Sequence, residues 1–259
     1  MLNTAARHGL PALAASVLHE LEAIKVPLRE YHFAPVLEAF VVNGQIKEAF
    51  RILDLIRSSG SEPTIETALP ILRAIQTDPD AVDNAYSILE ELVSEGQRIE
   101  ILALNTVLSG AVHMSDIQRA IGIYKSLNSI NLKPNLQTFN LLLDVCRRCS
   151  HFELSERLVK DMAEAGIKLD TTSYRNLIGV YLAQTNYEEA FFYLEHMKGQ
   201  GLKPTYYIYE SIIRRCISTG DTRYKLAVEE LEQMGYKMQP GLKSLIESGG
   251  ETSPKRKYQ

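Results

Sequence analysis

The sequence of 259 residues contains no tryptophan, only three cysteines and no long apolar run. A helix that crosses a bilayer needs about 20 mainly apolar residues, and the nearest approach to one, residues 10–18, is far shorter. Three cysteines in a chain of this length do not make a disulfide framework, so we expect a reducing compartment. These absences argue against a membrane-spanning protein and against a disulfide-rich secreted domain.

The motifs of common catalytic and metal sites are also missing. The six histidines are scattered, and the sequence has no His-Glu-x-x-His pair, Gly-rich phosphate loop or nucleophile elbow. Cys146 and Cys149 stand beside His151, but no second ligand pair follows, and a zinc site normally needs one. Cys146 also falls in an apolar slot, which favours a place in the core. We therefore expect no enzymatic activity, cofactor or metal.

Charge is distributed unevenly along the chain, whose net charge is −4. Residues 1–100 hold 8 Lys and Arg against 15 Asp and Glu, a net −7, whereas residues 101–259 hold 20 against 17, a net +3. An acidic chain argues mildly against broad affinity for nucleic acid. A polyanion would therefore prefer the C-terminal part, although solvated helix surfaces explain the charge equally well.

An alanine recurs at a nearly constant interval. The spacings are 35, 36, 35, 70 and 37 residues, with Ser155 filling the gap of 70, in the series Ala14, Ala49, Ala85, Ala120, Ala190 and Ala227. A fixed period of this length indicates an array of helical repeats, in which each unit buries its apolar face against its neighbours. Any function then belongs to a face of the array rather than to one deep cleft.

Each repeat contains two amphipathic segments, as residues 136–170 show. Apolar residues at i, i+3, i+4 and i+7 mark one face of a helix. The first stripe is Phe139, Leu142, Leu143 and Cys146, and the second is Ser155, Leu158, Val159 and Met162. The expected fold is all-α, a right-handed α-solenoid of stacked helix–turn–helix repeats of about 35 residues.

We place the array at residues 1–240. Full repeats are expected at 30–64, 65–100, 101–135, 136–170 and 171–205, and a degenerate cap repeat at 206–240, where Glu230 replaces a buried apolar residue. Residues 1–29 supply a second helix but almost no first helix, so we expect a half repeat there and hypothesise that a longer array or a partner element covers its face. Residues 241–259 are expected to form a disordered basic tail.

The repeats of this chain resemble those of the pentatricopeptide repeat family. The resemblance rests on Leu136-Gln-Thr-Phe-Asn-Leu-Leu-Leu143 in a first helix, Asn43-Gly-Gln-Ile-Lys-Glu-Ala49 at a turn, and Met197 followed by Gly201-Leu-Lys-Pro204 at a repeat end. It covers roughly residues 30–235. The tetratricopeptide repeat, with a period of 34 residues, fits less well because its first-helix signature is absent.

The resemblance implies a single-stranded RNA-binding protein of mitochondria, or of plastids, although residues 1–9 are too short to be identified as a transit peptide. In the family, the fifth and last residues of a repeat read one base, and the second residue packs against it. This rule points to Asn105 with Asn135, which resembles a cytidine reader, and to Asn140 with Asp170, which resembles a uridine reader. The RNA target would be pyrimidine-leaning.

The other positions fit the rule less well. The remaining full repeats offer the unusual pairs Ala34 with Thr64, Leu69 with Glu100, and Arg175 with Thr205. Packing or phosphate contacts are expected from Leu102, Gln137, Arg148 and Arg175, with further arginines at 147, 214 and 215.

Two alternatives stay open from the sequence alone. The asparagines could instead satisfy backbone groups near a helix start, where Asn is favoured. The whole chain could instead be a protein-interaction scaffold, such as an organellar ribosome component or a complex assembly factor. The main expectation is a non-catalytic RNA-binding protein acting in organelle RNA processing, stability or translation.

Overall fold

The computed structural model describes residues 1–249, and this part of the chain consists of helices and their connections, with no strand. None of its helices is both long and apolar enough to cross a bilayer. The helices are α1 (Leu2–Arg7), α2 (Pro11–Ala23), α3 (Glu30–Val42), α4 (Ile46–Ser58), α5 (Ile65–Ile75), α6 (Pro79–Ser94), α7 (Ile101–His113), α8 (Ile117–Lys125), η1 (Ser126–Asn128), α9 (Leu136–Cys149), α10 (Phe152–Glu164), α11 (Thr171–Ala183), α12 (Tyr187–Gly199), α13 (Tyr206–Ser218), α14 (Tyr224–Gln233) and α15 (Pro240–Glu247).

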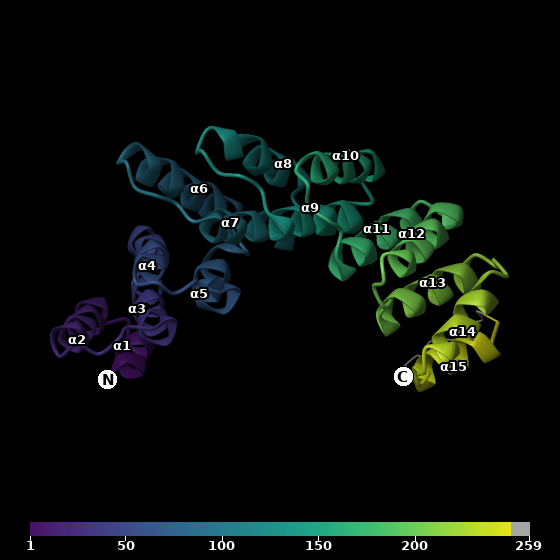
Figure 1. Cartoon of the computed structure of the whole chain (residues 1–259), viewed down its shortest axis with the longest axis horizontal. Coiled ribbons are helices and arrows are strands. Elements are labelled where there is room, and N and C mark those ends of the chain that lie inside the picture. The colour runs from purple at the N-terminus through teal and green to yellow at the C-terminus, as the bar shows by residue number, and fades with distance from the viewer. Residues whose placement is uncertain (250–259) are drawn as a thin grey trace, which may run out of the picture. The chain divides into compact units, whose positions relative to one another are not determined.

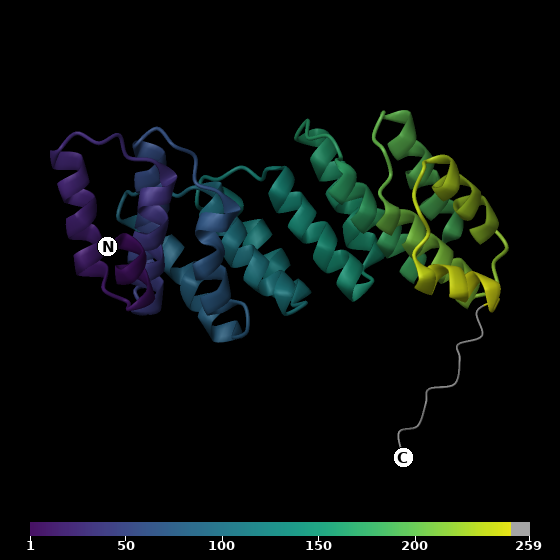
Figure 2. The same ribbon diagram turned by 90° about the horizontal axis from the view of Figure 1, so that it is seen from below.

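The helices form two compact units, Met1–Val145 and Cys146–Gln259, with the boundary inside α9. In the first unit, α1, α3, α5 and α7 form a row in which each contacts the next. The helices α2, α4, α6 and α8 pack against that row (Figure 1). In the second unit, α11, α13 and α15 make such a row, with α12 and α14 packed against it. Figure 2 shows the paired helices of each unit from below. The chain is thus an all-α array of stacked helix hairpins.

The expected stripes form the core of each repeat. The first-helix side chains of repeat 30–64, Phe33, Val36 and Leu37, are at most 1% exposed. The small residue that opens each second helix is also fully buried, from Ala14 through Ser155 to Ala227. Because these side chains are small, the two helices of a repeat approach each other closely. Each large apolar side chain of the stripes, such as Phe33 or Leu37, contributes about 1.5–3 kcal/mol by its burial.

The connections between repeats share one backbone geometry. Gly201 has φ 75° and Asn131, in the same slot of its repeat, has φ 53°. This left-handed conformation ends a helix and suits Gly or Asn. It allows the next amide to turn back, so that Leu202 N donates to Met197 O at 3.2 Å and Leu132 N donates to Leu127 O at 2.9 Å.

The two ends of the described chain differ from the sequence-based expectation. Residues 1–29 hold two helices rather than one, since the six-residue α1 precedes α2 and packs against α3. Residues 240–247 form α15, where the disordered tail was expected to begin, and Leu242 is fully buried as α15 packs on α13. Pro240 at the first helical position favours this start. The rest of the predicted tail, residues 250–259, lies outside the described residues.

The cap hypothesis placed Glu230 on a polar outer face, but in the structure its carboxylate is held between two other side chains. Its carboxylate accepts hydrogen bonds from Lys198 Nζ at 3.0 Å and from Tyr209 Oη at 3.2 Å. A half-buried carboxylate between a lysine and a tyrosine is satisfied in place of an apolar contact. The next helix, α15, packs against α13 as the first helix of a further repeat would.

Candidate nucleic-acid interface

The last residue of a repeat stands directly before the first helix of the next repeat, and at Asn135 and Asp170 its side chain caps that helix. Asn135 precedes α9, and its Oδ1 accepts a hydrogen bond from Thr138 N at 3.0 Å. Asp170 precedes α11 in the same way and accepts from Ser173 N at 2.8 Å. In both cases the hydroxyl of the third helical residue accepts from the capping residue's own N–H, which completes a reciprocal cap. Capping thus holds the predicted reading residues in place.

Asn105 and Asn135 lie together, as the pairing rule requires. Asn105 Nδ2 donates to Asn135 Oδ1 at 3.1 Å, and Asn105 Oδ1 accepts from Thr138 Oγ1 at 2.8 Å. Asn105 is 1% exposed in α7, whereas Asn135 is only partly buried. The two asparagines therefore form one cluster with an inner and an outer member.

Gln137 joins the same cluster. Its Oε1 accepts a second hydrogen bond from Asn105 Nδ2, at 3.2 Å. Gln137, Asn135 and Leu102 line a cavity of about 450 Å³ together with residues from the starts of α5 and α7. This volume lies within the roughly 300–1,000 Å³ of ligand pockets. Three of the predicted site residues thus share one concave surface.

The charge of this cavity is mainly negative. Glu62, Glu66 and Glu100 line it, against a single cation, Arg57. Arg57 Nη1 lies 2.8 Å from Glu100 Oε2, so its charge is largely neutralised. A phosphate would meet no unpaired cation among these lining residues, and any nucleotide would have to be held here by its base.

In repeat 30–64, the carboxylate of Glu30 engages the reading residue Thr64. Its Oε1 accepts hydrogen bonds from Thr64 N and Thr64 Oγ1, both at 2.7 Å, and from Thr67 Oγ1. Partial burial raises the pKa of Glu30, but these hydrogen bonds outweigh it and the pKa is lowered overall. Since position 34 is an alanine, this repeat presents no amide to a base.

The second predicted pair, Asn140 and Asp170, is divided between the units. Asn140 is partly buried on α9 in the first unit, and Asp170 caps α11 in the second. Its reading role remains a prediction.

The arginines fall into two groups. The guanidinium of Arg215 is already engaged within the protein. Its Nε and Nη2 donate to Leu182 O and Ala183 O, at the C-terminus of α11, at 3.0 and 3.3 Å. Arg214 pairs with Glu210 at 2.7 Å. Arg148 and Arg175 are exposed, on α9 and α11 respectively. Of the predicted phosphate contacts, these two are accessible.

The Cys-x-x-Cys segment is not arranged around a metal. Cys146 is fully buried, and burial raises the pKa of its thiol to about 12. His151 Nδ1 accepts from Leu154 N at 3.3 Å and caps α10. Within residues 1–249, no group of three or more His, Cys, Asp or Glu side chains is placed to hold a metal ion.

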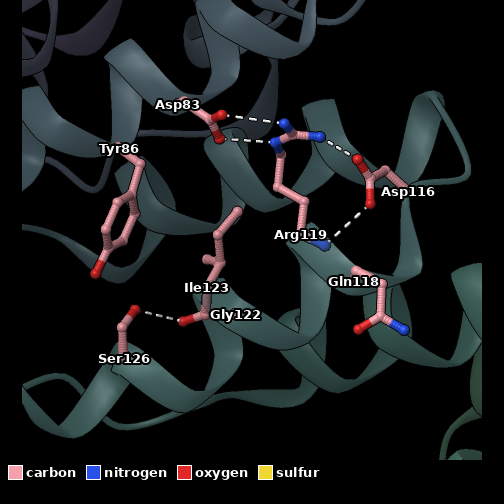
Figure 3. Close-up of a pocket in the computed structure, with 8 residues that line it drawn as sticks. All are labelled: Asp83, Tyr86, Asp116, Gln118, Arg119, Gly122, Ile123 and Ser126. Carbon is pink, nitrogen blue, oxygen red and sulfur yellow. Dashed lines mark hydrogen bonds and ion pairs between the residues drawn. The ribbon is translucent and has the colours of Figure 1, made fainter.

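A second depression, of about 420 Å³, lies between α6 and α8 (Figure 3). Arg119 crosses it with Nε 2.7 Å from Asp83 Oδ1 and Nη2 3.0 Å from Asp83 Oδ2, while its Nη1 binds Asp116. The hydrogen bond from Arg119 lowers the pKa of Asp83, and the pair raises the pKa of Arg119. Because two carboxylates neutralise the guanidinium, this depression is a clamp between helices rather than an anion site.

Sequence reasoning missed Thr138 and the hydrogen-bonding role of Gln137. We expected only a packing or phosphate contact from Gln137, because in the family the second residue of a repeat packs against the base. The signal was the polar residue itself: an amide at that position can bond with the asparagine 32 positions earlier, because the first helices of neighbouring repeats pack side by side.

Three models of pentatricopeptide repeats match the sequence. "Pentatricopeptide repeat-containing protein" matches residues 1–127, "PPR repeat" matches 137–167 and "Pentatricopeptide repeat domain" matches 157–218. A chloroplastic pentatricopeptide repeat-containing protein of Arabidopsis thaliana is 29% identical over 121 residues, which cover 46% of this chain and 25% of that protein. A mitochondrial one from the same plant is 24% identical over 155 residues, 59% of this chain and 24% of that protein. The chain thus spans about a quarter of the length of these relatives.

Solved structures share the fold. The pentatricopeptide repeat protein PPR10 from maize superposes with a TM-score of 0.59 at 20% identity, over 96% of this chain and 36% of that chain. The PPR domain of Arabidopsis thaliana protein-only RNase P 1, in complex with tRNA, gives a TM-score of 0.57 at 17% identity, over 73% of this chain and all of that domain. With the repeat period, the stacked hairpins and the matching models in agreement, the chain belongs to the pentatricopeptide repeat family.

Proposed function

We propose that the chain is a non-catalytic, single-stranded RNA-binding protein that reads a cytidine with repeat 101–135. The observation that carries this proposal is the hydrogen-bonded cluster of Asn105, Asn135 and Gln137, two members of which line a concave cavity. Amide side chains both donate and accept along a base edge. A row of such positions, one per repeat, is the geometry of helical RNA readers.

The family supports this proposal. A structure of PPR10 contains an 18-nt psaJ RNA element, and the RNase P domain was solved with tRNA. The relatives in Arabidopsis thaliana are chloroplastic and mitochondrial proteins. We infer that this chain acts in an organelle, in RNA processing, stability or translation, with mitochondria as the first choice and plastids as the second.

Binding is proposed to combine few base contacts with weak phosphate attraction. Asn140 and Asp170 would supply a second reading position, for uridine, and the exposed Arg148 and Arg175 would face phosphates. The first two full repeats would contribute little, because the carboxylate of Glu30 engages the reading residue Thr64 and a glutamate, Glu100, holds the last position of the next repeat. The recognised sequence is therefore short and pyrimidine-leaning.

The test is a single-atom exchange at the outer member of the cluster. Asn135→Asp keeps the oxygen that caps α9 and replaces the amide donors by a second acceptor. Fluorescence anisotropy with short oligo(C), oligo(U) and oligo(A) should show wild-type preference for pyrimidines, and the variant should shift the C-to-U affinity ratio toward uridine by about tenfold, within the ~1–3 kcal/mol of one well-made base contact.

The matched control is Asn84→Asp, the same exchange on the exposed side of α6. It should weaken binding slightly and equally for all probes. Binding that is indifferent to sequence and abolished by modest salt would show that only charge is at work, and would refute base reading.

One observation favours the alternative, a protein-interaction scaffold. The cavity carries three glutamates beside apolar Ile65, Ile101 and Leu102, a combination that also suits a basic segment of an organellar ribosomal or assembly partner. In that case RNA would not compete with the partner in a pulldown from organelle extract, and Glu66→Lys would abolish capture while leaving RNA binding unchanged.

A further inference from the structure

The orientation of the amide cluster is fixed by a backbone group. Thr138 N is a donor and can be nothing else, so the atom of Asn135 that faces it must be the carbonyl oxygen. The atom of Asn105 that meets this oxygen must then be its NH2 group, which in turn faces the oxygen of Gln137. One N–H of the main chain thus determines which way three amides point.

Asn105 has no hydrogen-bond donor left for a base, and it is almost fully buried. Its two Nδ2 hydrogens serve Asn135 and Gln137, its Oδ1 accepts from Thr138 Oγ1, and it is 1% exposed. The family rule gave this residue the reading role. Here its position makes it a positioning residue, which engages the two acceptor oxygens of its neighbours.

The outer face of the cluster consists of donors. Both residues line the cavity, both of their oxygens are engaged by Asn105, and neither Asn135 Nδ2 nor Gln137 Nε2 donates to a protein atom within residues 1–249. We propose that Gln137 reads the base together with Asn135, and that this pair of NH2 groups selects a base edge with two neighbouring acceptors. The inference rests on the RNA-binding function proposed above.

Among the pyrimidines, cytosine offers such an edge. Its N3 and O2 are adjacent acceptors, whereas N3 of uracil carries a hydrogen that would face a donor. An unpaired donor facing another donor in a partly buried site is costly. Gln137 is therefore expected to contribute to cytidine selection and not only to overall affinity.

The experiment exchanges one atom of Gln137. Gln137→Glu keeps the oxygen that binds Asn105 Nδ2 and replaces the amide donor by an acceptor. Anisotropy with oligo(C) and oligo(U) should show that the C-to-U affinity ratio of the wild type falls by about tenfold, the effect of one good base contact. Gln137→Met, which has similar length and no donor or charge, should lower the ratio in the same direction.

The control for added charge is Thr172→Glu, at the second position of repeat 171–205. It should weaken binding of both probes by the same factor and leave the ratio unchanged. If Gln137→Glu and Gln137→Met also leave the ratio unchanged while Asn135→Asp alters it, Gln137 is not a reader and the RNA-binding proposal stands. If the wild type binds neither probe, both proposals fail. Thermal melts followed by circular dichroism show whether each variant remains folded.

Discussion

Asn105 connects α7 to the start of α9 through three side-chain hydrogen bonds, and its own side chain is 1% exposed. A buried network of this kind is stabilising only while every member is satisfied. If one partner is removed, the polar atoms left behind carry a desolvation cost. The same residue therefore bears on stability and on the alignment of the donor face.

Asn105→Ala should lower the free energy of unfolding by about 2–3 kcal/mol, because it leaves Thr138 Oγ1 without this acceptor and opens a small cavity. Chemical denaturation measures this loss. Asn84→Ala, exposed on α6, should change stability by less than about 0.5 kcal/mol. In anisotropy, Asn105→Ala should also reduce the C-to-U ratio; an unchanged ratio would show that Asn105 has only a structural role.

At the scale of the element, the carboxylate of Glu30 in α3 stabilises the first turn of α5 by accepting from Thr64 and Thr67. The pKa of Glu30 is lowered below its ordinary 4.5 by these hydrogen bonds, which outweigh the opposing effect of burial. Folding therefore favours the ionised form. This contribution to stability is complete above the ordinary pKa and is lost as the pH falls through the lowered value.

Glu30→Gln should reduce the free energy of unfolding by about 1 kcal/mol at neutral pH, a modest value because the site is partly solvated. The difference from wild type should shrink as the pH falls below 4.5. Urea titrations of both proteins across this range measure it. Glu38→Gln, on the exposed face of α3, is the control and should show no such pH-dependent gap.

The docking of α15 on α13 depends on Leu242, which is fully buried. Leu242→Asp should release α15 and lower the local opening free energy there by about 2 kcal/mol or more. Hydrogen exchange should accelerate in α13 and α14 and stay unchanged in α3 and α5, since energies in repeat arrays are dominated by nearest neighbours. Lys243→Asp, one residue on and exposed, should leave exchange nearly unaltered.

At the scale of the whole molecule, the first hundred residues carry a net −7 and the remainder a net +3. The exposed Arg175 belongs to the basic part, whereas Arg57 of the acidic part is already paired with Glu100. Phosphate attraction should therefore be confined to the later repeats.

Arg175→Gln should weaken RNA binding and reduce the slope of log affinity against log salt by about 0.7–1, the value for one phosphate contact with a single strand. Arg57→Gln should change neither by a comparable amount, because its charge is already balanced. Anisotropy over a salt series compares the two, and equal effects would contradict a path of RNA along the C-terminal repeats.

The array of paired helices could be predicted from the sequence because the period of the small residue and the apolar stripes are local patterns. The network around Gln137 could not, since it joins side chains 30 or more positions apart and depends on which amide atom faces which. The helix α15 was missed because the basic composition after it suggested a tail. Yet Pro240 followed by Leu242, Leu245 and Ile246 carries a short helical spacing that was available to read.

The capping role of Asn135 and Asp170 restricts the residues that can replace them. Under the proposed function, Asn135 and Asp170 face a ligand and also start a helix, and the side chains that cap helices well are few: Asn, Asp, Ser and Thr. Replacing either residue by one that cannot cap, such as Ala, would cost about 1 kcal/mol of stability. To redirect this chain to a new RNA target, positions 135 and 170 are therefore best varied among these four residue types. Other side chains are better introduced at the nearby position of Gln137.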